Sequence, residues 1–120
     1  MLRMNEDLEG ALKGYLLQME KAAYYEAHEV IEEAWHPLRL RKDPLANLAK
    51  GLINAAVTFE HIKRGRENYA DKARRVIASF ERHKHLCIEG IAHYALFLAA
   101  CQKVEALKKE HGEVFDVLVS

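Results

Sequence analysis

Residues that interrupt helices are scarce in this sequence. Its 120 residues include two prolines and six glycines, and both prolines fall within residues 36–44. Because proline lacks a backbone N–H, it normally ends or bends a helix. Its scarcity leaves long segments on either side free to be helical. No segment shows the polar–apolar alternation that predicts a strand.

The sequence also lacks a cysteine framework and long apolar runs. Its two cysteines, Cys87 and Cys101, lie among apolar residues, which indicates free thiols in a reducing compartment. The first ten residues, MLRMNEDLEG, lack the apolar run of a signal peptide. The longest apolar stretch, near Tyr94 to Cys101, is shorter than the ~20 residues that a membrane span needs. We therefore expect a cytoplasmic protein that does not enter a membrane.

An excess of charge of one sign is lacking as well. Lysine and arginine together number 18, as do aspartate and glutamate, so the net charge is zero with histidine neutral. Binding to nucleic acid usually needs a strong basic field. The short basic runs at residues 39–42 (RLRK) and 72–75 (KARR) are of a kind that is usually solvated. We expect no nucleic-acid partner, whereas a homodimer or a protein partner stays open.

What the sequence does have is helical spacing of its apolar residues. Its length suits one domain, and we predict an all-α single domain over residues 1–120, built as a bundle of about five helices. The expected helices cover roughly residues 5–20, 24–36, 44–64, 68–80 and 89–109. Asn5 and Asn68 are expected to cap the first and fourth helices, and Gly65 to end the third. The tail VFDVLV (114–119) is expected to dock on the bundle.

The stretch YYEAHEVIEEAW (residues 24–35) carries four glutamates and a histidine. At ~100° per residue, its small and branched apolar residues should face the core: Ala27, Val30, Ile31 and Ala34. The opposite side then holds Tyr25, His28, Glu29, Glu32 and His36, with Trp35 at its edge. Such a face is usually an ordinary solvated one, and His28 and Glu32 can simply pair at their i,i+4 spacing.

The third expected helix is apolar around most of its circumference, which indicates a central position. Asn54, Thr58 and His61 form a narrow polar stripe on it. Buried polar groups need hydrogen-bond partners, and the second helix offers carboxylates and an imidazole. We therefore predict a small pocket between the second and third helices. The alternative is that the stripe lies at an exposed margin.

Three kinds of site residue follow from this pocket. The candidate ligand-binding residues are Tyr25, His28, Glu29, Glu32, Trp35, Asn54 and His61. The candidate catalytic groups are Glu29, Glu32 and His28, because crowded carboxyls shift one another's pKa. The candidate metal ligands are His28, Glu29, Glu32 and His61, a set that suits zinc, manganese or iron. The sequence names no cofactor, and it does not decide whether the protein is an enzyme.

The segments YYEAHEVIEEAW and GLINAAVTFEHIKRG resemble the family called domain of unknown function 309. The first box is matched by Tyr25, Glu26, Ala27, His28, Glu29, Glu32 and Trp35, and the second by Gly51, Leu52, Ile53, Ala55, His61 and Gly65. Asn54 stands where the family has glutamine. The resemblance covers roughly residues 15–80 and implies a small all-helical protein, without implying an activity.

Two functions therefore remain open. One is a pocket between the second and third helices that binds a small ligand or a metal ion. The other is a structural or partner-binding module, in which the polar cluster only fixes the packing of the helices.

Overall fold

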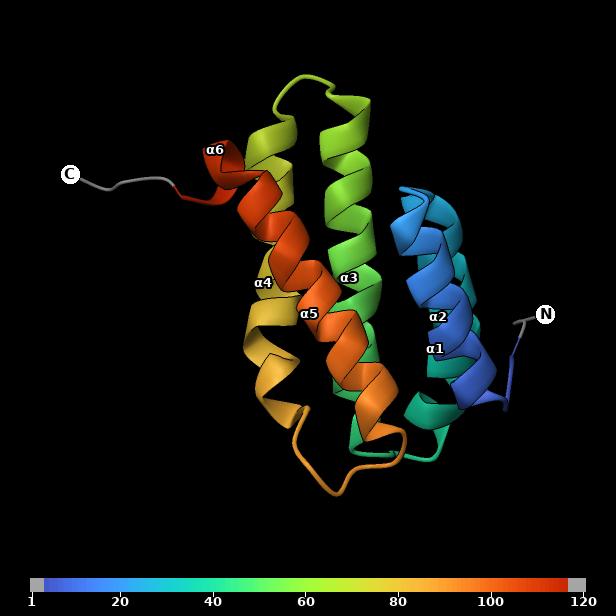
Figure 1. The fold of residues 1–120 in the computed structure, drawn as a ribbon. Coiled ribbons are helices and arrows are strands. Elements are labelled where there is room, and N and C mark those ends of the chain that lie inside the picture. Colours follow the sequence, from blue (N-terminus) through green and yellow to red (C-terminus); the bar gives the residue numbers. More distant parts are fainter. Residues whose placement is uncertain (1–3, 117–120) are drawn as a thin grey trace.

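The computed structural model describes residues 4–116, and within that range the chain forms helices and no strand (Figure 1). The elements are α1 (Leu8–Glu20), α2 (Tyr24–Leu40), α3 (Leu45–Arg64), α4 (Tyr69–His83), η1 (Lys84–Leu86), α5 (Tyr94–Glu110) and α6 (Gly112–Phe115). The predicted all-α domain is confirmed, with five long helices and the short α6. None of the helices described is long and apolar enough to cross a membrane.

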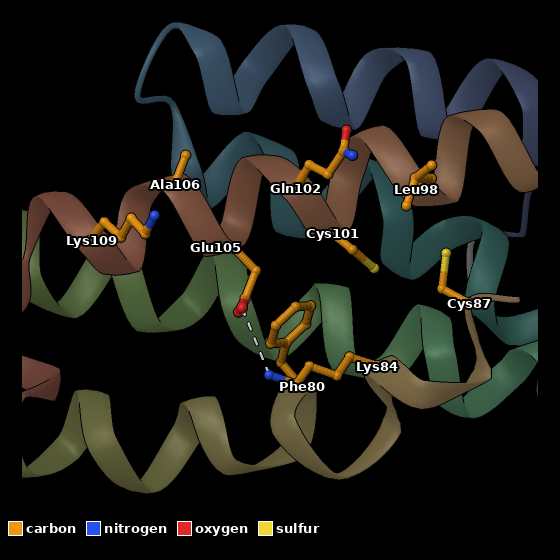
Figure 2. Close-up of a pocket in the computed structure, with 9 residues that line it drawn as sticks. All are labelled: Phe80, Lys84, Cys87, Leu98, Cys101, Gln102, Glu105, Ala106 and Lys109. Carbon is orange, nitrogen blue, oxygen red and sulfur yellow. Dashed lines mark ion pairs between the residues drawn. The ribbon is translucent and has the colours of Figure 1, made fainter.

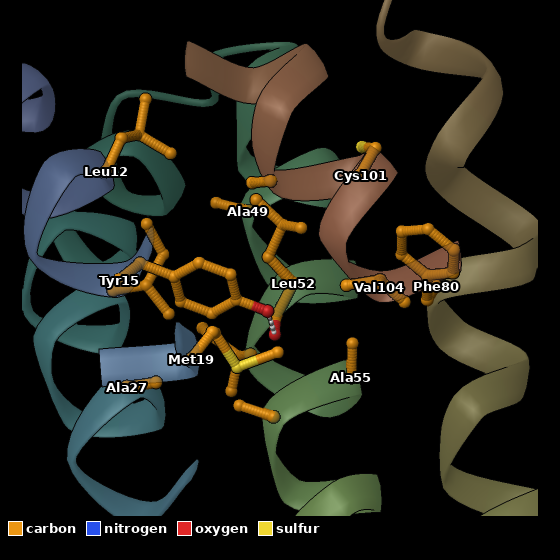
Figure 3. Packing of buried hydrophobic residues seen from close by; sticks show 14 of the residues in the cluster. Leu12, Tyr15, Met19, Ala27, Ala49, Leu52, Ala55, Phe80, Cys101 and Val104 are labelled. Carbon is orange, nitrogen blue, oxygen red and sulfur yellow. Dashed lines mark hydrogen bonds between the residues drawn. The ribbon is translucent and has the colours of Figure 1, made fainter. Parts of the chain in front are cut away.

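Helix α3 is the centre of the bundle, as predicted. It lies between α2 and α4, while α1 packs on α2 and α5 crosses the front of the bundle (Figure 1). Helix α1 also reaches α3 directly, because the buried Tyr15 hydroxyl donates a hydrogen bond to the carbonyl oxygen of Leu52, 2.8 Å away (Figure 3). The short turns between successive helices make α2 and α3 antiparallel neighbours.

The contact between α3 and α4 depends on a glycine. A Cβ atom placed on Gly51 would lie 3.1 Å from the Cα atom of Phe80, in the backbone of α4. Contacts that short are tighter than ordinary van der Waals packing, so a side chain at this position would push the helices apart. The glycine of the second sequence box therefore has a packing role in this fold.

The prediction that the second helix ends before Pro37 is wrong. Helix α2 continues to Leu40 with Pro37 buried inside it, so the connection to α3 is confined to residues 41–44. Proline cannot donate to the carbonyl group four residues earlier, which here belongs to Glu33. That carbonyl oxygen accepts the backbone N–H of Asn5 instead, at 2.8 Å.

The helix starts also differ from the predictions. Asp7, and not Asn5, caps α1, because its carboxylate accepts the backbone N–H of Gly10 at 2.9 Å. Asn68 does precede α4, but it has a positive φ of 63° and its side chain makes no capping hydrogen bond. The end of α3 is as predicted, with Gly65 in the left-handed conformation at φ 60°.

The fifth helix begins at Tyr94, later than the predicted start near Glu89. Residues 87–93 are irregular, and the left-handed φ angles of Gly90 (103°) and His93 (57°) explain why the helix cannot extend through them. At the other end, the predicted tail begins with α6, where Val114 is buried and the ring of Phe115 lies 6.1 Å from that of Phe59. Residues 117–119 of that tail lie outside the described residues.

Candidate functional site

A cleft of about 180 Å³ opens between the N-terminal half of α2 and the C-terminal half of α3. We call it the α2–α3 cleft, and it is lined by Tyr24, Tyr25, His28, Val57, Glu60, His61 and Arg64. Because the two helices run antiparallel, residues early in α2 meet residues late in α3. Three of the predicted ligand-binding residues, Tyr25, His28 and His61, therefore lie on one cleft although they come from different helices.

Tyrosine rings form one wall of the cleft. The Tyr25 ring is 49% exposed and its centroid lies 5.6 Å from that of His28. Tyr24 is buried, and its ring lies 5.8 Å from that of Phe59 in the core. Burial raises the pKa of Tyr24, with nearby Lys103 acting in the opposite direction. This tyrosine is therefore neutral at physiological pH and offers an apolar surface with a hydroxyl group.

His28 is held by a neighbour on its own helix. Its Nε2 atom lies 3.0 Å from Oε2 of Glu32, and because a carboxylate only accepts, Nε2 carries a proton. The Nδ1 atom of His28 is buried and has no hydrogen-bond partner among the described residues. Glu32 thus orients the ring, while the second ring nitrogen is left for another group.

His36 continues the same stripe of α2. Its Nε2 atom lies 3.9 Å from the other carboxylate oxygen of Glu32, and its Nδ1 atom is likewise buried without a partner among residues 4–116. Its ring lies 5.0 Å from that of Trp35. Glu32 therefore stands between two imidazoles, but neither it nor His36 lines the α2–α3 cleft.

The remaining predicted residues lie outside the cleft lining. Glu29 is exposed on α2 and forms no hydrogen bond or ion pair with the described part of the chain. Trp35 lies in the C-terminal half of α2, beyond the cleft. The Lys50 ammonium lies 4.4 Å from its ring centroid, and this contact connects α2 to α3. Asn54 is partly buried. Its backbone carbonyl oxygen accepts a hydrogen bond from the hydroxyl of the buried Thr58, at 2.8 Å. The Thr58 hydroxyl therefore has its hydrogen-bond partner within α3.

Charged side chains of both signs lie near His61, namely Arg64 and Glu60 of α3 and Lys72 of α4. Burial lowers the pKa of His61, and Lys72 and Arg64 lower it further, while Glu60 acts in the opposite direction. Arg64 pairs with Glu60, its Nε atom lying 2.6 Å from a carboxylate oxygen. His61 is therefore neutral at pH 7, with one nitrogen that donates and one that accepts.

The predicted metal ligands do not form a cluster. No group of three or more histidine, cysteine, aspartate or glutamate side chains in residues 4–116 is arranged to hold a metal ion. His28 and His61 line the cleft, Glu32 is turned to His28, and Glu29 is exposed. The described residues thus give no support to a mononuclear site built from these four side chains.

Sequence reasoning missed four residues of the cleft: Tyr24, Val57, Glu60 and Arg64. Glu60 and Arg64 have the i,i+4 spacing of an ion pair, which on its own predicts only a solvated helix face. Val57 looks like one more core residue in an apolar helix. Tyr24 lies within the glutamate-rich stretch, but helical projection does not separate it from the core side.

Comparison with known proteins gives one finding on identity. Residues 12–73 match the family described as Domain of unknown function (DUF309), and this segment contains both helices that line the cleft. No curated protein and no solved structure matches the chain. The family match covers more than half of the 120 residues. The chain therefore belongs to the Domain of unknown function (DUF309) family.

Proposed function

We propose that the chain binds a small single-ring acid in the α2–α3 cleft. The observation that carries the proposal is the convergence of two imidazoles and two tyrosine side chains, from two helices, on one space. Concave sites with apolar walls and a few convergent polar groups are typical of small-molecule binding. Here the walls are Tyr24, Tyr25 and Val57, and the polar groups are His28 and His61.

The size of the cleft limits the ligand. Its volume of about 180 Å³ lies below the roughly 300–1,000 Å³ of sites that take drug-sized molecules. At about 30 Å³ per molecule of liquid water, it holds the equivalent of about six waters. One aromatic ring with one substituent is therefore the scale of molecule that we expect.

The charges around the cleft favour an acidic substituent. Lys72 and Arg64 both disfavour the protonated form of His61, so a carboxylate bound beside this imidazole would offset their repulsion. We therefore expect the pKa of His61 to rise when the acid binds. His28 would supply the second imidazole of the cleft lining, held in place by the hydrogen bond between its Nε2 atom and Glu32.

Glu32 would act in this site as a positioning residue for His28. The proposal gives no ligand contact to Glu29, Trp35 or Asn54, and it assigns no reaction. The alternative of a purely structural polar cluster is less well supported, because the His28–Glu32 hydrogen bond lies within one helix. A bond of that kind does not fix how α2 packs on α3.

Benzoate is the probe that tests the proposal. Thermal melts of the full chain would compare benzoate with acetate, which has the acid without the ring, and with benzyl alcohol, which has the ring without the acid. At ten times its dissociation constant, benzoate should stabilise the fold by about 1.4 kcal/mol. Acetate and benzyl alcohol at the same concentration should have a much smaller effect.

Two histidine variants serve as a matched pair. His61→Ala should remove the benzoate effect, whereas His85→Ala, at an exposed position of η1, should leave it unchanged. A benzoate effect that survives in His61→Ala, or that acetate reproduces, would reject the proposal. Loss of stability in His61→Ala without any benzoate effect in the wild type would favour the structural alternative.

A further inference from the structure

The two cysteines line a second hollow of the bundle, between α4 and α5. Cys87 lies in the irregular segment that follows η1, and Cys101 lies in α5. Both line a hollow of about 470 Å³ between α4, η1 and α5, which we call the α4–α5 hollow. Figure 2 shows both side chains at its edge, with the sulfur atom of Cys101 extended toward the segment that carries Cys87. Neither cysteine is in a disulfide.

The two thiols are close enough to affect each other's ionisation. Burial raises the pKa of Cys87, and the neighbouring Cys101 thiol acts in the opposite direction. Burial together with the neighbouring Cys87 raises the pKa of Cys101 to about 12. Both side chains are therefore protonated thiols at neutral pH.

The donor set decides which ligand would suit this pair. Thiolate sulfur is a soft donor that selects soft ions such as copper(I). Structural zinc needs four ligands, but the described residues contain no cluster of three or more histidine, cysteine, aspartate or glutamate side chains arranged for a metal ion. A soft ion that is satisfied by two sulfur donors is therefore the metal class that this pair matches.

The charged groups around the pair are of both signs. Lys84, Lys109 and Glu105 all line the same hollow (Figure 2), and Lys84 forms ion pairs with Glu81 and Glu105. Cys101 lies in α5, whereas Cys87 lies in the irregular segment that follows η1.

We propose that Cys87 and Cys101 form a two-thiol site that binds a soft, two-coordinate metal ion of the copper(I) class. Binding replaces two S–H bonds with two metal–sulfur bonds and releases two protons, so no electron is transferred. This site is separate from the α2–α3 cleft, and it does not depend on the function proposed for that cleft.

Silver(I) is the probe, because it shares the two-coordinate thiolate chemistry and does not change its oxidation state in the assay. The reduced, tag-free full chain would be loaded with silver nitrate and challenged with an excess of the monothiol 2-mercaptoethanol. Native mass spectrometry would then report the silver that remains bound. Two thiols held side by side gain about 10²–10⁴-fold in affinity over one thiol. The wild type should therefore retain one silver ion per chain.

Single substitutions provide the comparison. Cys87→Ser and Cys101→Ala should each lose silver to the monothiol, with an affinity about 10²–10⁴-fold below that of the wild type. Circular dichroism melts would show that the variants are folded, and because Cys87 is only partly buried, Cys87→Ser keeps the test valid if Cys101→Ala is unstable. If the monothiol strips the wild type as readily as Cys87→Ser, the two-thiol site is rejected.

Discussion

The backbone N–H of Asn5 donates a hydrogen bond to the carbonyl oxygen of Glu33, 2.8 Å away. In an unbroken helix this carbonyl group would accept the N–H of residue 37, but Pro37 has none. The segment that precedes α1 thus supplies the donor that α2 lacks. Helix α2 can therefore continue through Pro37 as far as Leu40.

Removal of residues 1–5 should cost more stability in the wild type than in the Pro37→Ala variant. In the variant, the backbone N–H of the alanine can donate to the Glu33 carbonyl group. That carbonyl group therefore keeps a hydrogen-bond donor when Asn5 is removed. We expect a coupling of about 0.5–1.5 kcal/mol, the net value of one hydrogen bond. Urea unfolding of the four proteins measures it as a double-mutant cycle. Equal costs in both backgrounds would show that the Asn5–Glu33 bond does not support α2.

Substitution of Gly51 by alanine should destabilise the fold by about 1–3 kcal/mol, the typical cost of overpacking. The new methyl group would meet the backbone of Phe80, which cannot turn aside. Gly14→Ala is the matched control, because its methyl group would meet only the side chain of Val30, which is partly exposed. That variant should be neutral or more stable, since alanine favours helix over glycine by about 1 kcal/mol. Urea unfolding that gives both variants the same stability would refute the packing role of Gly51.

The fold should lose stability as the pH rises above about 10. Burial holds the pKa of Tyr15 well above its usual value of 10.0, so the unfolded chain releases this proton at a lower pH than the folded one. The free energy of unfolding therefore declines above the unfolded pKa and is unaffected by Tyr15 below it. Tyr15→Phe should decline less steeply above pH 10. It should also be less stable near pH 7 by about 0.5–1.5 kcal/mol, because it loses the bond to Leu52. Parallel pH curves for the two proteins would contradict this account.

Removing the charge of Lys72 should raise the pKa of His61 toward its usual value of 6.5. Burial and the positive charges of Lys72 and Arg64 lower this pKa, so His61 costs the fold stability as the pH falls below about 6.5. An NMR titration of the imidazole resonances in Lys72→Gln measures the change. Arg82→Gln removes the same charge from another exposed position of α4 and is the control. The same His61 pKa in both variants would exclude a direct effect of Lys72.

Local patterns in the sequence are enough to predict most of the helices. The apolar spacing of α3 and the left-handed Gly65 mark that helix from start to end, because both depend on residues next to one another in the chain. The prediction failed at Pro37 because the compensating donor, Asn5, comes from a distant segment. It failed at the start of α5 because His93 has a left-handed conformation, and the residue type histidine does not predict one.

The candidate site was harder to predict. Helical projection put His28 on one stripe and His61 on another, and both line the α2–α3 cleft. It did not separate Glu29, which is exposed, from Glu32, which bonds to His28. Which of the two glutamates bonds to His28 depends on the orientation of the side chains. The helical period does not determine that orientation. Thr58 illustrates the same limit, because its hydroxyl bonds to its own helix.

Entry of an acid into the α2–α3 cleft is the central claim. The most direct test of this claim is a titration of the full chain with benzoate. The imidazole NMR resonances report the binding. We predict that the resonances of His28 and His61 move along one saturating curve, that the pKa of His61 rises, and that the exposed His85 does not respond. If His28 and His61 show no saturable change, or if His85 changes in the same way, the α2–α3 cleft is not a binding site for a single-ring acid.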